Sequence, residues 1–294
     1  MSRYIALTLC ALVWSTQAFA QSLVVVVGFA PGGTSSTIAR ILADGLKEPL
    51  RKSVIVENKP GAGGIVAAEF VRKQMPGTHL LVVSSSSLTN VPPETLTAVA
   101  MVAKFHYVAV VHRELGVRDL AEYLSRAKAD EKELLYGSFG VNTLAHLMGK
   151  ELARLSNIPL EVVQFRGAAE AALNVRGRHV PMAILPVPDF LAHQDVLLAL
   201  AQGGATRTHT LPRVPTFVES GHALEAQGWM GVMVAHGTDP AFVRRLSELI
   251  PRIAQEHSAQ LSTLGFEAPE ATDPVAFGRY HQDEYDRWLA VTRR

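Results

Sequence analysis

Cysteine is almost absent from this sequence of 294 residues, and the single residue Cys10 cannot form an internal disulfide bond. Aromatic residues make up 7% and charged residues 19% of the chain, against 48% hydrophobic residues, which excludes a disordered chain or a disulfide scaffold. Charge of either sign is not in excess, with 28 basic and 27 acidic residues, so no net field attracts a nucleic acid or an anionic membrane. The composition is that of a globular protein whose length favours about two domains.

The first twenty residues have the pattern of a secretory signal peptide. Arg3 gives a positive start, residues 4–14 form an uncharged apolar run, and Ala18-Phe19-Ala20 is a small-x-small signal-peptidase site. The run is shorter than the ~20 residues that span a bilayer, which disfavours a membrane anchor. We therefore predict cleavage after Ala20 and an exported protein without cysteine.

Short apolar strands alternate with helices along the rest of the chain. Residues 23–27 have no polar interruption, as in a strand buried on both faces of a parallel sheet. A glycine-rich loop and a helix follow, and one face of this helix carries Ile38, Ile41, Leu42 and Leu46. The pattern repeats, with further strands expected at 54–57, 80–83, 107–111, 134–136, 161–165, 182–185 and 197–201, and further helices ending near 73 and over 118–129, 142–155, 167–176, 242–257 and 274–293. This succession predicts an α/β fold of two domains, with the chain crossing between them as strands.

Three loops share one chemistry, because each follows a strand, is rich in glycine or serine, and opens a helix. They cover residues 30–35, 84–89 and 137–143. In open α/β sheets, ligands bind beyond the carboxyl ends of the strands, where free backbone N–H groups of a helix N-terminus suit an anion. The loops therefore predict an anion site that needs no lysine or arginine, although each loop on its own also fits a plain capped turn.

Familiar catalytic and cofactor patterns are not met. Residues 61–64 lack the last glycine of a dinucleotide fingerprint, and the first glycine of a nucleophile elbow around Ser138 would fall on Tyr136. The histidines beyond the signal lack the i, i+4 spacing of a helical metal pair. No metal, cofactor or catalytic residue is predicted, and an enzyme is disfavoured.

A series of short motifs runs in order from about Leu23 to Trp288. Its main members are Phe29-Ala30-Pro31-Gly32-Gly33, Val56-Glu57-Asn58-Lys59-Pro60-Gly61-Ala62-Gly63-Gly64, Tyr136-Gly137-Ser138-Phe139-Gly140, Phe165-Arg166-Gly167, Leu211-Pro212-Arg213-Val214-Pro215-Thr216, Trp229-Met230-Gly231 and Gly237-Thr238-Asp239-Pro240. The series resembles the Bug-type receptors, which are the periplasmic solute-binding proteins of tripartite tricarboxylate transporters.

The resemblance implies a periplasmic-binding-protein type II fold that closes on a small organic carboxylate. Lobe 1 is expected to comprise residues 21–105 plus 227–294, and lobe 2 residues 106–226. The ligand-binding residues that the resemblance implies are Pro31, Gly32, Gly33, Thr34, Ser35, Ser84, Ser85, Ser86, Ser138, Gly140, Asn142, Thr143 and Arg166. It also implies a monomer whose partner is a pair of membrane permease subunits or a sensor protein. The alternative is an exported α/β hydrolase acting on a small acid or ester.

Several positions depart from the resembled family. Ser36 stands where the family usually has aspartate, Pro181 and Leu185 stand near its acidic residues, and Arg166 replaces its lysine; residues 88–97 are also shortened. Asp189 is the nearest acidic residue downstream, but it follows two prolines and is expected to point to solvent. The cleft is therefore predicted to lack counter-charge and to prefer a carboxylate without an α-ammonium group.

Overall fold

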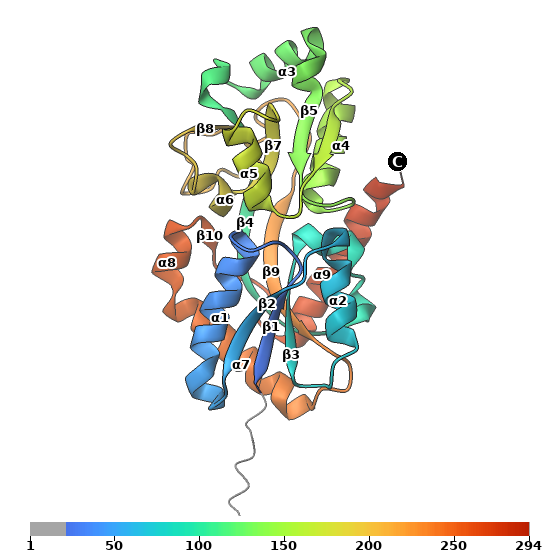
Figure 1. The fold of residues 1–294 in the computed structure, drawn as a ribbon, viewed down its shortest axis with the longest axis vertical. Helices are drawn as coiled ribbons and strands as arrows, with labels where there is room; N and C mark the ends of the chain where they lie inside the picture. Colours follow the sequence, from blue (N-terminus) through green and yellow to red (C-terminus); the bar gives the residue numbers. More distant parts are fainter. Residues whose placement is uncertain (1–21, 294) are drawn as a thin grey trace, which may run out of the picture.

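The computed structural model describes residues 22–293, and the predicted signal peptide with its cleavage site lies outside them. Figure 1 shows two α/β lobes stacked along the long axis of the molecule, with α1 and α2 flanking the strands of the lower lobe and α3, α4 and α5 in the upper one. Among the described residues, no helix combines the length and the apolarity that crossing a membrane would require.

The elements follow the expected α/β succession. The strands are β1 (Leu23–Val27), β2 (Val54–Asn58), β3 (His79–Ser84), β4 (Thr97–His112), β5 (Leu135–Ser138), β6 (Glu161–Gln164), β7 (Met182–Pro186), β8 (Leu197–Gln202), β9 (Gln227–Val234) and β10 (Phe266–Glu267). The α-helices are α1 (Thr34–Leu50), α2 (Ile65–Arg72), α3 (Leu120–Ala129), α4 (Leu144–Ser156), α5 (Ala168–Arg176), α6 (Val187–Leu191), α7 (Pro240–Glu256), α8 (Ser258–Thr263) and α9 (Pro274–Thr292). Short 3-10 turns cover Ala62–Gly64, Ser85–Asn90, Pro93–Thr95, Arg113–Leu115 and Glu131–Leu134.

The strands form one continuous sheet that is divided between the lobes. In the lower lobe the order is β2-β1-β3-β9-β4, with β1 parallel to β2 and β3, and with β9 antiparallel to both of its neighbours. In the upper lobe the order continues as β4-β7-β5-β6, and β8 also pairs with β4. The parallel strands β1, β3 and β5 point their carboxyl ends toward the junction of the lobes, where the predicted loops lie (Figure 1).

Strand β4 links the lobes. Its first part pairs with β9 as far as His106, and its second part pairs with β7 from Tyr107 onward. The chain returns through residues 203–226 and enters β9 at Gln227. The crossing of the chain as strands is confirmed.

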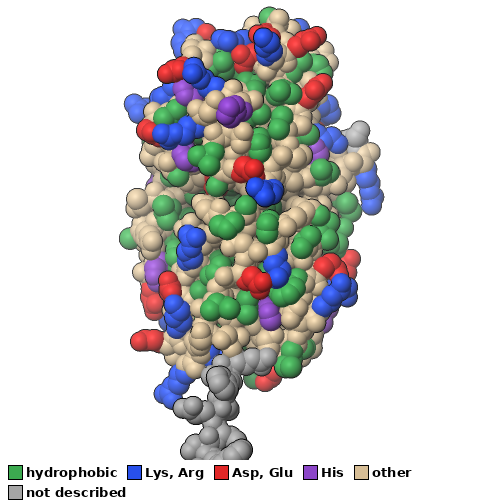
Figure 2. Space-filling view, viewed as in Figure 1, with side chains coloured by type: hydrophobic (Ala, Val, Ile, Leu, Met, Phe, Trp, Pro, Cys, Tyr) green, Lys and Arg blue, Asp and Glu red, His purple; other side chains and the backbone are tan. Residues whose placement is uncertain are grey.

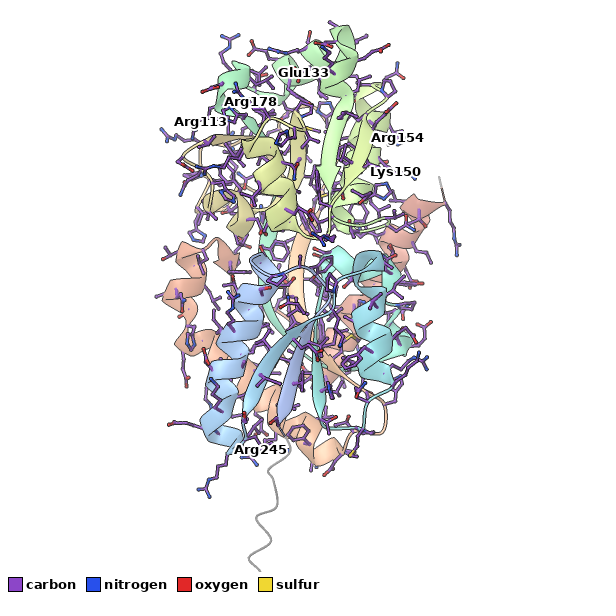
Figure 3. All side chains as sticks on the ribbon, viewed as in Figure 1. Arg113, Glu133, Lys150, Arg154, Arg178 and Arg245 are labelled. Carbon is purple, nitrogen blue, oxygen red and sulfur yellow. The ribbon has the colours of Figure 1, made fainter. Side chains whose placement is uncertain are left out.

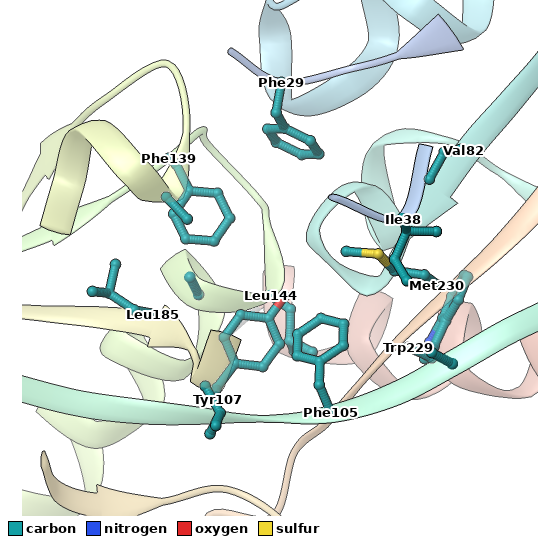
Figure 4. Close-up of a cluster of buried hydrophobic side chains, with 14 of the residues drawn as sticks. Phe29, Ile38, Val82, Phe105, Tyr107, Phe139, Leu144, Leu185, Trp229 and Met230 are labelled. Carbon is teal, nitrogen blue, oxygen red and sulfur yellow. The ribbon is translucent and has the colours of Figure 1, made fainter. Parts of the chain in front are cut away.

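Buried apolar side chains hold each lobe together. Helix α1 packs Ile38, Leu42 and Leu46 inward without exposure, which confirms the predicted helix face. At the junction, a cluster of aromatic and aliphatic side chains lies between the elements of both lobes (Figure 4). Strand β9 was not predicted from the sequence, although Trp229 at its centre is fully buried.

Candidate functional site

The two lobes touch directly across their junction. The Ala30 N–H donates to the Arg166 carbonyl at 3.2 Å, and the Asn90 side-chain amide donates to the Val141 carbonyl at 2.9 Å. A Cβ atom on Gly140, whose φ is +133°, would lie 2.9 Å from the Cα of Gly63, so glycine permits the two backbones to meet. These contacts define a closed conformation of the lobes.

A small cavity lies between the lobes at this junction. Its lining residues are Phe29, Ala30, Gly33, Thr34, Ser35, Ser86, Phe139, Ala168, Pro186, Asp189 and Met230. Its volume of about 20 Å³ is enough for about one water molecule. In the closed form the side chains therefore fill most of the space, and a larger ligand requires the lobes to separate.

The first predicted loop forms one wall of this cavity. Thr34 and Ser35 are buried, and Gly33 is the residue that precedes helix α1. Because none of the first residues of α1 is acidic and Gly33 has no side chain to cap it, the backbone N–H groups there need an acceptor from elsewhere. Pro31 and Gly32 are exposed and do not line the cavity.

Asp189 of the opposite lobe supplies that acceptor. The backbone N–H of Thr34 donates to Asp189 Oδ2 at 3.4 Å, and the Thr34 hydroxyl donates to the same oxygen. The side chain is 5% exposed, so the expectation that Asp189 points to solvent is wrong. Its direction depends on the approach of helix α1, which lies 155 positions away in the sequence.

The carboxyl of Asp189 is held in an unusual electrostatic setting. Burial raises its pKa from 3.8 to about 6, while the two hydrogen bonds from Thr34 act in the opposite direction. Burial dominates because water is largely excluded and no cationic side chain lines the cavity. A carboxyl group thus already lies at the N-terminus of α1, where the sequence predicts that an anion binds.

The serines after β3 have different surroundings. Ser86 lines the cavity, and its hydroxyl lies 2.7 Å from the Tyr107 hydroxyl, which also lies 3.3 Å from Ser85 Oγ. Ser85 in turn accepts the backbone N–H of Trp229 at 3.2 Å. Ser84 is buried but does not line the cavity. Of the three serines, Ser86 therefore lies on the cavity wall, and Ser85 binds the backbone of β9.

In the second lobe, the predicted polar residues mostly bind one another. The Thr143 hydroxyl donates to the Gly140 carbonyl at 2.8 Å and lies 3.4 Å from Ser138 Oγ, while the Asn142 N–H donates to His146 Nδ1 at 2.9 Å. None of the four predicted residues lines the cavity; Phe139 between them does. The loop thus presents an aromatic ring to the cavity while its polar groups stabilise the start of α4.

Phe139 meets Phe29 across the junction. Their ring centroids are 5.9 Å apart in an edge-to-face arrangement, and Figure 4 shows the two rings close to each other. Both rings also line a groove of about 430 Å³, which contains Arg166. The Arg166 side chain is 80% exposed and pairs with Glu170 at 3.5 Å, so it lies outside the cavity.

Charged side chains are unevenly distributed on the face shown in Figure 2, where many lie toward both ends and fewer near the middle. The labelled residues of the upper lobe include Arg113, Arg178 and Arg154, and Arg245 lies at the far end of the lower lobe (Figure 3). None of the arginine and lysine residues labelled in Figure 3 lines the cavity between the lobes.

The apolar wall of the cavity was not predicted from the sequence, and Asp189 was expected to point to solvent. Phe29, Ala30 and Phe139 stand inside the motifs given above, but they were not predicted to line the site. The position of Asp189, three residues beyond the end of β7, was the available signal, because this is another strand whose carboxyl end faces the junction. Within the described part of the chain, no three His, Cys, Asp or Glu residues form a group that could hold a metal ion.

Replacing Gly33 by alanine is expected to weaken ligand binding more than folding. Its φ of −92° suits alanine, but the new Cβ would lie 3.1 Å from Asp189 Oδ1 when the lobes close. We expect about fivefold weaker binding of a carboxylate, because relieving such a contact costs on the order of 1 kcal/mol. Calorimetry and urea denaturation measure the two effects.

The same replacement in an Asp189→Ala background provides the control, because the added methyl group then has no carboxylate to meet. If Gly33→Ala lowers stability and binding equally, the residue serves only to form the turn.

Comparison with known proteins gives consistent matches over the chain. Residues 38–294 match the family described as "Tripartite tricarboxylate transporter family receptor". Protein BugT of Bordetella pertussis is 28% identical over 295 residues, covering 93% of this chain and 89% of that protein. The periplasmic binding protein BugD has a similar structure, with a TM-score of 0.86, 22% identity and coverage of 92% and 96% of the two chains. An R. palustris protein whose structure holds adipate has a TM-score of 0.87, 25% identity and coverage of 95% and 97%.

Proposed function

This chain belongs to the receptor family of the tripartite tricarboxylate transporters, and we propose that it captures a small organic carboxylate between its lobes. The sequence resemblance is thereby confirmed, and so is the type II periplasmic-binding-protein fold. The chain is a solute-binding receptor, and the alternative of an exported hydrolase is not supported.

The observation that carries this proposal is that donors at the start of α1 already bind a carboxyl group, that of Asp189. Thr34 presents a backbone N–H and a hydroxyl to a carboxyl group between the lobes, and Ser35 and Ser86 add hydroxyls on the same wall. Donors in this arrangement, at the positive end of a helix, suit a ligand carboxylate. The similar R. palustris structure with adipate supports the same ligand class.

The location and partners follow from this function. We place the mature receptor in the periplasm after cleavage behind Ala20, and as a monomer that passes its ligand to membrane permease subunits or reports it to a sensor protein. A partner that distinguishes the loaded receptor from the empty one has to respond to closure of the lobes around the ligand. The ligand must therefore stabilise a closed form in which the lobes stand further apart than in the closed form described above.

A thermal-shift panel of small carboxylic acids tests the proposal. An acid at about 100 times its dissociation constant adds roughly 2.7 kcal/mol to the stability of the folded protein. For a chain of this size the melting temperature should rise by roughly 5 to 10 °C. The diamide of each acid serves as the control, because it has the same length without the charge. If no acid stabilises the protein, or if amides stabilise it equally, the carboxylate proposal fails.

A further inference from the structure

The cavity contains one ionisable side chain, and half of its hydrogen-bonding capacity is unused. Asp189 Oδ2 accepts both hydrogen bonds from Thr34. Within residues 22–293, no hydrogen bond reaches Oδ1, which lies beside Gly33 on the cavity wall. Because Oδ1 receives no donor from these residues, a donor from the ligand can bind it, and a hydrogen bond to a charged group is stronger than one between neutral groups.

The charges around the cavity favour a cationic donor. Apart from Asp189, the residues with polar side chains in the lining are Thr34, Ser35 and Ser86, and the lining contains no lysine, arginine or histidine. The start of α5 at Ala168 and the start of α1 at Thr34 both reach this wall. A ligand carboxylate placed there comes close to the Asp189 carboxylate, and two like charges in so dry a site repel each other strongly.

An ammonium group on the ligand removes this conflict. It can donate to Asp189 Oδ1 while the ligand carboxylate accepts from the helix starts and the serine hydroxyls. The two charges of the ligand then face complementary groups, and the negative charge of Asp189 is paired. A hydroxyl group at the same position of the ligand can donate a hydrogen bond to Asp189. It carries no positive charge, so the repulsion between the ligand carboxylate and the Asp189 carboxylate remains.

We propose that Asp189 is a specificity-determining residue that accepts the α-ammonium group of an α-amino acid ligand. This inference rests on the proposed carboxylate-binding function, and it reverses the sequence-based expectation of a ligand without an ammonium group. That expectation depended on Asp189 pointing to solvent, whereas the side chain is buried in the cleft.

Matched ligand pairs test the inference by calorimetry. L-aspartate is paired with L-malate, L-glutamate with 2-hydroxyglutarate, and L-leucine with 2-hydroxyisocaproate, so that each pair differs in one group. We expect the better-bound pair to show a preference for the amino acid of about tenfold to a hundredfold, the range of a charge-assisted hydrogen bond. Asp189→Asn should remove most of this preference, because the amide is nearly the same size but neutral.

Asp195→Asn is the matched control, because Asp195 is an exposed aspartate of the same lobe that pairs with Arg176 at 3.5 Å. It should keep the preference of the wild type, and circular dichroism of both variants checks that they fold. The inference would be overturned if hydroxy acids or adipate bind and the amino acids do not. It would also be overturned if the preference for the amino acid survives in Asp189→Asn. Either result would leave the proposed carboxylate-binding function intact. If none of these acids nor any acid of the thermal-shift panel binds, both proposals fail.

Discussion

Asp189→Asn is expected to abolish a pH-dependent contribution of about 3 kcal/mol to the stability of the closed protein. Burial raises the pKa of the Asp189 carboxyl from 3.8 to about 6, so between these values the folded protein holds a proton that the unfolded chain releases. This contribution is fully present below about pH 4 and is lost as the pH rises through 6. Urea denaturation of the wild type and the variant between pH 4 and 7 measures it.

The comparison must be a difference between two proteins, because other groups titrate in the same range. Burial lowers the pKa of His281 to about 4, so the stability that its neutral ring contributes is lost as the pH falls from 6.5. That contribution opposes the one from Asp189 but is common to both proteins and cancels. The wild type should therefore lose stability relative to Asp189→Asn as the pH rises. A difference that does not change with pH would mean that Asp189 is solvated, contrary to the closed junction described above.

Trp229→Ala is expected to lower the free energy of unfolding by about 3 to 5 kcal/mol, the range for a large aromatic side chain removed from a core. Trp229 lies fully buried in β9 and makes edge-to-face contacts with Phe277 and His281 of α9, at centroid distances of 5.5 and 5.3 Å. The cavity left behind would loosen α9 from the sheet. Because Met230 on the cavity wall is the next residue, ligand binding should also weaken. Urea denaturation and calorimetry measure the two losses.

Trp229→Phe is the matched control. The indole Nε1 has no hydrogen-bond partner among the described residues, so phenylalanine removes a buried unpaired donor while it keeps an aromatic ring in place. The phenylalanine variant should lose less than about 1.5 kcal/mol. If both variants lose the same free energy of unfolding, the packing of an aromatic ring at this position does not account for the stability that Trp229 contributes.

Local patterns made much of the first lobe predictable. The uninterrupted run of β1, the glycine loop and the amphipathic face of α1 each depend on neighbouring residues, and all three appear in the structure. Strand β9 was harder to predict because Gly228 and Gly231 weaken its strand propensity. The structure explains these glycines, since a Cβ would lie 2.2 Å from the Phe105 ring at Gly228 and 2.1 Å from the Phe277 ring at Gly231. Such contacts between distant segments leave no local signal.

The sequence predicted which loops reach the junction, but only some of the residues that line the cavity there. Gly33, Thr34, Ser35 and Ser86 lie on the cavity wall, and their role in binding a ligand stays a prediction. The hydroxyls of the second lobe turn toward their own loop because the start of α4 needs capping, which competes with any ligand for Thr143. The orientation of Asp189 depends on how the two lobes meet, and a reading of single loops cannot supply it.

The most direct test of the carboxylate receptor is to identify what the cleft holds in the cell. The protein is purified from the periplasm of the cells that express it without added ligand, denatured, and the released small molecules are measured by mass spectrometry. We predict a small carboxylic acid at up to one molecule per chain, which is depleted when the Asp189→Asn variant is purified in the same way. Recovery of a stoichiometric ligand without a carboxyl group, such as a sugar, would contradict the account.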